Sequence, residues 1–511
     1  MIKKILPLVF IFSVGTFSAC KSFLDITPID KLTGNNFYKS LLDVEYATND
    51  LYGAFFRKYE QTAFAAATGE FRSGECIGAP QETGRQSPAV FGRNDLNLIV
   101  RRDQPWDGYR FDLITYWDEY YRIIQSANLL IAKINEGVPG MSDADNKRYI
   151  AESKFMRCLA YFFMVRLYGD VPYYTDAYQK DPLPREKMVT VMNNCIADLT
   201  PSINDVPWQY QDPALKGVRA SRGAIMVLLM HMNMWNSAFD PANKTKYCQE
   251  AANYGDQIVK SNAYQLLPIE QWNLVVRGRS NESLFEFFNT INYEGSTRSD
   301  NAYAPFGDAF IHFPYKQPEF THRYSFTVFK REYMQRLYPE SEPDMRKQAW
   351  FVAQYDQDHT TFQLLKFAAN TFIGSGNPDE DRNPDNAFLI FRYGDAILLR
   401  AEALAELGGA SEQEAVRMLN MIRDRAKATP YSGGSSQTLK DAIFLERSKE
   451  LLGEGHRYFD LVRTGRILSN QWTDNPLTQD QFNRGGWTWP LNSSALNNNP
   501  LISLNTYWVS Q

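Results

Sequence analysis

Cysteine is scarce in this chain, which has 511 residues but only five cysteines. Four of them, Cys76, Cys158, Cys195 and Cys248, are widely separated and form no C-x-x-C pair, so the sequence predicts no disulfide framework. Cys158 falls in a strongly helical stretch, where a free thiol behaves as a small apolar residue. We therefore expect Cys158 to be buried and unpaired.

Long basic runs are also missing. The 54 Lys and Arg residues are outnumbered by 59 Asp and Glu residues, which gives a formal net charge of -5. Because nucleic-acid binding needs Lys and Arg clustered against phosphates, this class of function is excluded.

The usual motifs of catalysis and metal binding are absent as well. The chain has no H-E-x-x-H, no G-x-S-x-G and no Walker phosphate loop. No zinc-binding spacing relates the five histidines, His231, His312, His322, His359 and His456. The sequence therefore predicts no catalytic residue, no resident metal and no cofactor. A glycosidase carboxylate pair depends on a separation in space that cannot be read from a sequence, so that enzyme class stays open.

Hydrophobic runs long enough to matter for a membrane occur only at the N-terminus. Elsewhere the longest is the seven residues Ala224–Met230, whereas a membrane helix needs about twenty. At the N-terminus, Lys3 and Lys4 precede a largely apolar run of thirteen residues and then Ser18-Ala19-Cys20. A basic start, a short apolar middle and small residues before a processing point are typical of a secretory signal.

The residue at the end of this signal is a cysteine. Small residues followed directly by cysteine resemble the lipobox of bacterial lipoproteins, in which the new N-terminal cysteine is acylated. We therefore predict that residues 1–19 are a signal peptide and that Cys20 carries the lipid anchor. Each acyl CH₂ buried in lipid contributes about 0.8 kcal/mol, so several chains would hold the protein on a membrane almost permanently.

Helical periodicity dominates the remainder of the chain. Apolar residues recur at steps of three and four over eight segments, 116–135, 144–167, 185–199, 221–239, 247–261, 395–407, 411–426 and 439–452. The segment 221–239 is the most apolar and is predicted to lie centrally. Consecutive helices with short connections indicate stacked hairpins, as in a tetratricopeptide solenoid.

Three stretches lack this period: 69–112, 271–317 and 374–386. They are long and rich in Gly, Pro, Asn and Arg, and loops of such length are usually functional or disordered. Their many aromatic residues argue against disorder. The tail 468–511 also lacks a period, and its tryptophans are predicted to pack across the body.

The most specific signal in the chain is the segment 446–465, ERSKELLGEGHRYFDLVRTG. It resembles the C-terminal signature of the SusD/RagB family, the nutrient-binding outer-membrane lipoproteins of Bacteroidetes. Further matches occur in the family's order: Phe23-Leu24-Asp25, Arg157 leading to Tyr168-Gly169-Asp170-Val171-Pro172, Asn281-Glu282-Ser283, Arg392-Tyr393 and Leu419-Asn420. The resemblance covers essentially the whole mature chain.

The resemblance implies an all-α fold, a tetratricopeptide-like body of helical pairs with a long irregular ligand-binding region, and no catalysis. Such proteins lie over a SusC-like TonB-dependent transporter in the outer membrane and capture oligosaccharides or, in some members, peptides. The expected function is therefore oligosaccharide capture at the cell surface. Peptide cargo is the alternative, and an exported glycoside hydrolase is a third hypothesis. The domain 20–511 divides into a helical part (20–270), an irregular middle (271–386) and a signature part (387–511).

The charges of the signature also have a physical interpretation. Glu446 and Glu450 lie one helical turn apart, and Arg457 and Arg463 flank Asp460. Guanidinium groups can bind carboxylates bidentately, so this set is predicted to stabilise the fold rather than to catalyse. His456, beside Glu454, is likewise expected to support the helix turn.

A glycan-binding surface needs flat apolar rings for sugar C–H faces and planar polar groups for paired hydroxyls. The first irregular stretch supplies both, and the second adds tyrosines. Trp106 is the leading candidate because Gln104-Pro105-Trp106-Asp107-Gly108 reads as an exposed turn, although a Trp that caps the core is the open alternative. The predicted ligand-binding residues are Arg72, Arg101, Asp103, Trp106, Tyr109, Tyr303 and Tyr315.

Overall fold

The computed structural model describes residues 38–60, 64–78, 87–100, 110–290, 307–317, 319–320, 322–372, 382–497 and 499–509. These residues are mostly helical, and the strands among them form only two-stranded sheets. The predicted all-α fold class is therefore confirmed. The signal peptide and Cys20 lie outside the described residues.

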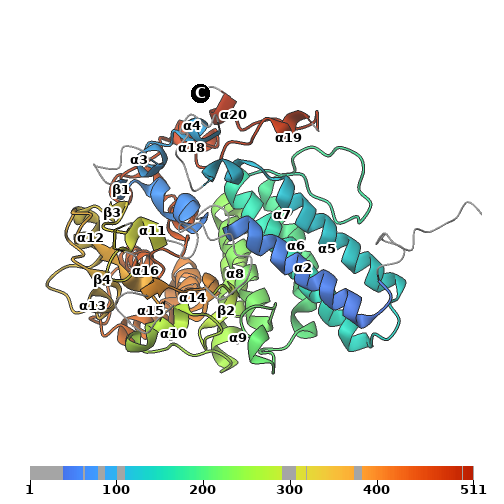
Figure 1. The fold of residues 1–511 in the computed structure, drawn as a ribbon, viewed down its shortest axis with the longest axis horizontal. Coiled ribbons are helices and arrows are strands. Elements are labelled where there is room, and N and C mark those ends of the chain that lie inside the picture. The colour runs from blue at the N-terminus through green and yellow to red at the C-terminus, as the bar shows by residue number, and fades with distance from the viewer. Residues whose placement is uncertain are drawn as a thin grey trace, which may run out of the picture.

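Six long helices form the first half of the body, and each packs against the next along the chain (Figure 1). They are α2 (Leu41–Glu60), α5 (Asp118–Glu136), α6 (Asp143–Tyr168), α7 (Met188–Leu199), α8 (Arg222–Phe239) and α9 (Lys244–Lys260). The predicted helices agree with α5 to α9 within a few residues. The stacked helical pairs confirm the predicted tetratricopeptide-like body, whereas α2 was not predicted.

The ends of α6 show why the sequence signal is clear. The hydroxyl of Ser142 accepts a hydrogen bond from the backbone N–H of Asp145 at 3.1 Å, and the Asp145 carboxylate accepts one from the N–H of Ser142 at 3.2 Å. This capping box starts the helix. Gly169, with φ of 75°, ends it in a conformation that favours glycine.

Helix α8 is buried at every residue from Gly223 to Ser237. A helix that is apolar around its whole circumference must be covered on all sides. The predicted central position of this segment is therefore confirmed, with α7 on one side and α9 on the other.

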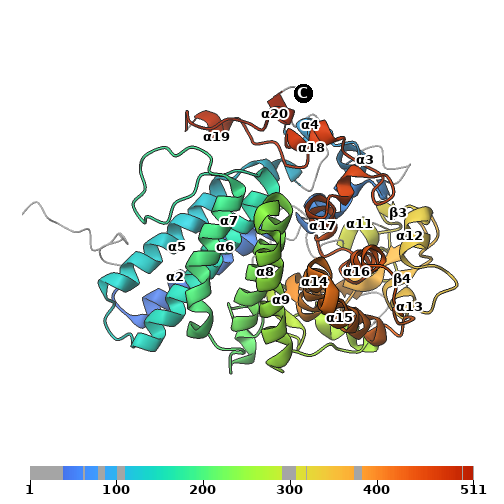
Figure 2. The ribbon, with the colours of Figure 1, turned by 180° about the vertical axis from the view of Figure 1, so that it is seen from behind.

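The second half of the body begins at α14 (Tyr393–Leu407), far along the chain from α9, yet the two helices pack side by side (Figure 2). The antiparallel pairing of Ser283 with Arg392 and Phe287 with Phe388 brings the two ends of the intervening segment together. Its short elements are α10 (Trp272–Val276), β2 (Ser283–Phe287), α11 (Gly307–Phe310), β3 (Thr327–Phe329), α12 (Arg331–Leu337), α13 (Arg346–Trp350), β4 (Phe351–Val352), β5 (Gln363–Leu364), β6 (Asn370–Phe372), β7 (Arg382–Pro384) and β8 (Phe388–Arg392).

The first irregular stretch contains more structure than its lack of periodicity predicts. A π-helical turn (Ala66–Glu70) leads to β1 (Cys76–Gly78), which pairs with β3, and two short helices follow, α3 (Ser87–Gly92) and α4 (Leu96–Val100). Elements of three to six residues are too short to establish a hydrophobic period, which is why this region was predicted as irregular.

The C-terminal part builds on α14, which packs against α9, α15 and α16. Its helices are α14 (Tyr393–Leu407), α15 (Glu412–Arg425), α16 (Ser436–Glu450), α17 (Arg457–Arg463), α18 (Gln479–Asn483), α19 (Ser494–Asn497) and α20 (Thr506–Val509). Trp487, Trp489 and Trp508 of the tail are all buried, and the Trp489 ring centre lies 5.6 Å from that of Phe91. The tail therefore packs across the body as predicted.

The cysteines and helix lengths agree with the sequence analysis. Cys158 is buried, as are Cys76, Cys195 and Cys248, and all four are free thiols. In the described part of the chain, no helix combines the length and the hydropathy of a membrane span.

Candidate ligand-binding site

Most of the predicted ligand-binding residues lie outside the described residues: Arg101, Asp103, Trp106, Tyr109 and Tyr303. Their assignment stays a prediction. Arg72 and Tyr315 are described, and they contact different parts of the molecule.

Arg72 is completely buried and bound to the C-terminal tail. Its Nη1 donates to the carbonyl of Trp487 at 2.6 Å, and its Nη2 donates to Asn94 Oδ1 at 2.6 Å and to the carbonyl of Gly486 at 3.0 Å. The guanidinium also lies 4.2 Å from the ring centre of Tyr458. Because this side chain has no exposed surface, its position is that of a packing residue rather than of a ligand contact.

Tyr315 is half-buried and packs against the main hydrophobic core. Its backbone N–H donates to the carbonyl of His312 at 2.9 Å, which fixes the turn after α11. The partly exposed ring keeps Tyr315 as a candidate for ligand contact.

The charges of the 446–465 signature form a buried network instead of a site. Glu450 accepts hydrogen bonds from Arg346 at 2.9 Å, from Arg392 at 2.7 Å and from Arg425. Glu454 binds Arg392 at 2.8 Å. Burial alone would raise the pKa of Glu450, but the charges of Arg425, Arg392 and Arg346 hold it well below its ordinary value.

This network joins segments that are remote in sequence. Arg346 begins α13, Arg392 ends β8, and Arg425 ends α15, while Glu450 ends α16. The signature therefore fixes the inserted segment against the C-terminal helices, which supports its predicted role in stabilising the fold.

A second buried cluster surrounds Asp460, as its flanking arginines suggested. Arg463 lies 2.7 Å from the Asp460 carboxylate and Arg447 lies 2.9 Å from it. Arg457 points elsewhere and binds the buried Glu75 at 2.7 Å. The prediction of structural carboxylate–guanidinium pairs is correct here, although Arg457 has a different partner from the neighbouring Asp460.

One group of side chains has the composition of a metal site. His231, Asp395 and His456 are buried, and each offers a ligand atom within 4.8 Å of the others. However, one Asp395 oxygen binds His231 Nε2 at 2.7 Å, and the other binds the guanidinium of Arg447 at 2.9 Å. A cation placed here would displace His231 and face Arg447, so the cluster fits a structural role better than metal binding.

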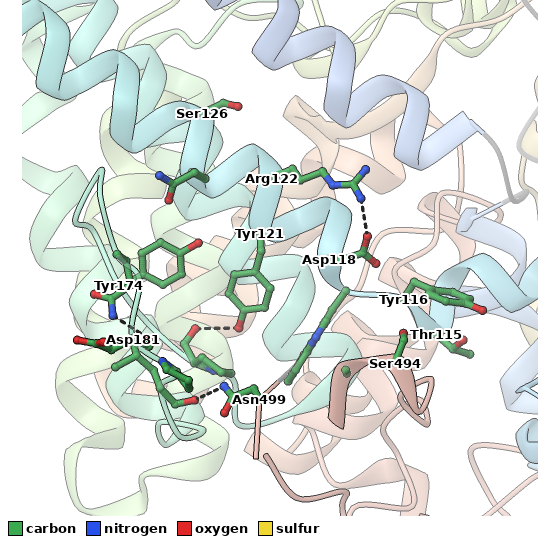
Figure 3. Close-up of a pocket in the computed structure, with 17 residues that line it drawn as sticks. Thr115, Tyr116, Asp118, Tyr121, Arg122, Ser126, Tyr174, Asp181, Ser494 and Asn499 are labelled. Carbon is green, nitrogen blue, oxygen red and sulfur yellow. Dashed lines mark hydrogen bonds and ion pairs between the residues drawn. The ribbon is translucent and has the colours of Figure 1, made fainter. Parts of the chain in front are cut away.

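A pocket of about 920 Å³ lies beside α5 (Figure 3). Three segments line it: 115–126 around the start of α5, 172–183 in the loop between α6 and α7, and 494–499 at α19. Its size lies within the range of about 300–1,000 Å³ that is usual for small-molecule sites.

Two half-buried tyrosines lie at the centre of this pocket. The rings of Tyr121 and Tyr174 are nearly parallel, with 12° between their planes and 6.0 Å between their centres. Trp117 supports Tyr121 from the side, in an edge-on contact at 5.5 Å. Figure 3 shows the two tyrosine rings side by side, with Arg122 and Asp118 on the side of Tyr121 away from Tyr174.

The loop wall of the pocket is fixed by hydrogen bonds from three directions. The hydroxyl of Tyr121 donates to the carbonyl of Pro172 at 2.9 Å, and Gln125 donates to that of Ala177. Asn499 of the tail donates to the carbonyl of Leu183 at 2.8 Å. At the far end of the loop, Arg185 donates to the carbonyl of Asp170 at 2.6 Å. The pocket is therefore formed before any ligand arrives.

Neither Arg72 nor Tyr315, the two predicted ligand-binding residues that the structure describes, lines this pocket. The helix that contains Tyr121 is predicted from its apolar stripe, but Tyr121 is not one of the buried residues that form this stripe. A signal was available in the repeated aromatics Tyr120-Tyr121 and Tyr173-Tyr174, which exceed what a single buried stripe requires.

Comparison with known families covers nearly all of the described chain. A model described as the SusD family matches residues 235–508, and one described as starch-binding and associating with the outer membrane matches residues 63–232. The chain belongs to the SusD family. This assignment agrees with the signature and the helical body, and it makes the protein a member of a glycan-binding family associated with the outer membrane.

Individual SusD proteins agree with this assignment. A solved SusD homologue of Bacteroides thetaiotaomicron is 35% identical, with a TM-score of 0.82 over 92% of this chain and 98% of that one. The starch-binding protein SusD of the same organism is 22% identical over 98% of this chain and 97% of its own. A solved laminarin-binding SusD-like protein, 22% identical, shares the fold with a TM-score of 0.69 over 92% of this chain and 99% of its own.

Proposed function

We propose that this SusD family member is a surface lipoprotein that captures oligosaccharides and passes them, without catalysis, to a SusC-like TonB-dependent transporter. The observation that carries the proposal is the pair of family matches, one of which is described as starch-binding and associating with the outer membrane. The solved SusD-like protein that binds laminarin has the same fold, so glycans other than starch also have a precedent.

The pocket beside α5 supports glycan rather than peptide as the cargo. Flat tyrosine faces suit the C–H faces of sugars, and planar or hydroxyl side chains suit their OH groups. Trp106, Tyr109, Arg101, Asp103, Tyr303 and Tyr315 remain proposed contributors to the ligand surface.

The binding step is tested by calorimetric titration of the purified mature chain with a panel of oligosaccharides and of peptides. We expect saturable heat with at least one oligosaccharide, and no release of reducing ends during prolonged incubation. Binding of peptides alone would show that the cargo is peptide. Steady release of reducing ends by the pure protein would show that it is a glycoside hydrolase.

The anchoring step is tested by Cys20→Ala. A single missing thiol removes the site of acylation without touching the folded body, so the variant should bind oligosaccharide in solution as the wild type does. It should, however, be lost from the membrane fraction, and cells that carry it should lose oligosaccharide uptake. Uptake at the wild-type level would contradict the transporter role.

A further inference from the structure

We propose that the pocket formed by segments 115–126, 172–183 and 494–499 is an oligosaccharide-binding site, and that its ligand is a neutral glycan rather than a uronate or a sulfated one. This inference rests on the proposed function and assigns it a place and a substrate class. The pocket contains neither Arg72 nor Tyr315, the two predicted ligand-binding residues that the structure describes.

The aromatic centre of the pocket provides the first part of the argument. Tyr121 and Tyr174 come from α5 and from the loop after α6, yet their rings lie within 12° of parallel. Tyr121 is part of helix α5, and the backbone at Tyr174 is held by the Tyr161 hydroxyl, which donates to the Tyr174 carbonyl at 2.9 Å. Two fixed, half-exposed rings of similar tilt present flat apolar faces, which pack well against sugar C–H faces.

The polar rim provides the second part. Exposed side chains of Asp118, Arg122, Ser126, Asp181 and Ser494 surround the rings. They include carboxylate, guanidinium and hydroxyl groups, which together can donate hydrogen bonds to sugar hydroxyls and accept them. A purely apolar ligand would displace water from these exposed groups without replacing its hydrogen bonds.

The charge of the pocket selects between classes of glycan. Among the lining residues that the structure describes, the only guanidinium is that of Arg122, and it lies 3.2 Å from the carboxylate of Asp118. Asp181 therefore gives the described lining a net negative charge. The positive end of α5 does not compensate for it, because Asp118 and Glu119 already occupy the first turn. An acidic glycan would meet repulsion here, whereas a neutral glycan would not.

The rigidity of the loop wall completes the argument. The hydrogen bonds to the carbonyls of Pro172, Ala177 and Leu183 come from α5 and from the tail, so the loop is held along its length. A wall that is already ordered loses little conformational entropy when a ligand binds.

The test is calorimetric titration of the mature chain with neutral hexaoses (malto-, laminari-, cello- and xylohexaose) and with acidic oligogalacturonate and oligoalginate. Tyr174→Ala removes one ring and should weaken binding of the neutral ligand about tenfold. Tyr174→Phe keeps the ring and should bind like the wild type. Tyr178→Ala removes an exposed tyrosine from the same loop, outside the pocket, and should also have no effect.

A second variant keeps the inference testable if Tyr174→Ala fails to fold. Asp181 is exposed, so Asp181→Lys should fold normally, and it should raise the affinity for oligogalacturonate several-fold by reversing the local charge. No gain with oligogalacturonate would contradict the charge argument.

The outcomes separate this inference from the proposed function. If the wild type binds a neutral hexaose but Tyr174→Ala binds it equally well, the pocket assignment fails and glycan capture stands. If the wild type binds only the acidic oligosaccharides, the neutral class is wrong. If it binds neither kind, both the inference and the proposed function fail.

Discussion

Two regions of this molecule use charged and aromatic residues in opposite ways. In the signature network, Glu450 and its partners Arg346 and Arg392 are almost completely buried. In the pocket beside α5, Arg122 and Asp118 form an ion pair whose side chains are 77% and 52% exposed. The chemistry of the pairs is the same, but the solvent around them differs.

That difference decides what each pair can do. Buried ions have lost their hydration, so each is stabilised mainly by its oppositely charged partner. Removal of one partner leaves an uncompensated buried charge. Exposed ions contribute little to stability, and they can exchange water for a ligand. We therefore expect the signature to determine folding and the pocket to determine binding, although the signature dominates the family resemblance.

The largest expected effect comes from the buried side of this comparison. Arg392→Ala should lower the free energy of unfolding by about 3–5 kcal/mol, because Glu450 and Glu454 would keep their charges without this partner. Denaturant unfolding followed by circular dichroism measures the loss. Arg417→Ala is the matched control: its side chain is 56% exposed and paired with Glu414, so its loss should be below about 1 kcal/mol. Equal losses of unfolding free energy in the two variants would contradict the distinction between buried and exposed ion pairs.

A second prediction concerns a buried carboxyl that lacks such a network. Burial raises the pKa of Glu70 to about 8, and its carboxylate accepts one hydrogen bond, from the N–H of Gly453 at 3.2 Å. Because the folded pKa lies above the unfolded value, the group stabilises the fold at pH below about 4.5 and loses that contribution as the pH rises toward 8.

Glu70→Gln replaces the neutral acid with a neutral amide and should remove this pH dependence. At pH 8 the variant should be more stable than the wild type, by an amount on the order of a few kcal/mol, and at pH 4.5 the advantage should disappear. Thermal unfolding of both proteins at the two pH values measures the difference. A constant difference across this range would mean that Glu70 is ionised in the folded protein.

The smallest expected effect tests the pocket wall. Asn499→Ala removes the hydrogen bond to the Leu183 carbonyl. This should destabilise the ordered conformation of the loop by about 1 kcal/mol and weaken binding of a neutral hexaose about fivefold. Calorimetric titration measures the affinity. Asn497→Ala, an exposed neighbour in α19 that does not line the pocket, should leave it unchanged. Equal affinities for all three proteins would show that the loop needs no support from the tail.

The sequence predicted the helical body well because its helices carry local signals. Ser142 and Gly169 mark the ends of α6, and the apolar composition of 221–239 requires burial. Helix α2 was not predicted, although Val44, Leu51 and Phe55 are buried at helical spacing. The structural role of the signature charges was predicted from the local Arg463–Asp460 spacing, whereas the partners of Glu450 and Arg457 come from segments remote in sequence.

The site was harder to predict because its parts meet only in three dimensions. Arg72 looked like a ligand contact, yet Gly486 and Trp487, more than four hundred residues later, cover it. Tyr121 and Tyr174 are brought together by the course of the loop after α6, which no local pattern specifies. Local periodicity therefore predicts elements, whereas surfaces assembled from distant segments need the fold.

The most direct test of the separation between the two regions measures stability and affinity on the same two variants. Unfolding free energy and the Kd for a neutral hexaose are determined for Arg392→Ala and Tyr174→Ala at a temperature where both are folded. We predict that Arg392→Ala loses stability and keeps the wild-type Kd, while Tyr174→Ala keeps its stability and binds about tenfold more weakly. The opposite pattern, with weaker binding in Arg392→Ala and unchanged binding in Tyr174→Ala, would contradict the account.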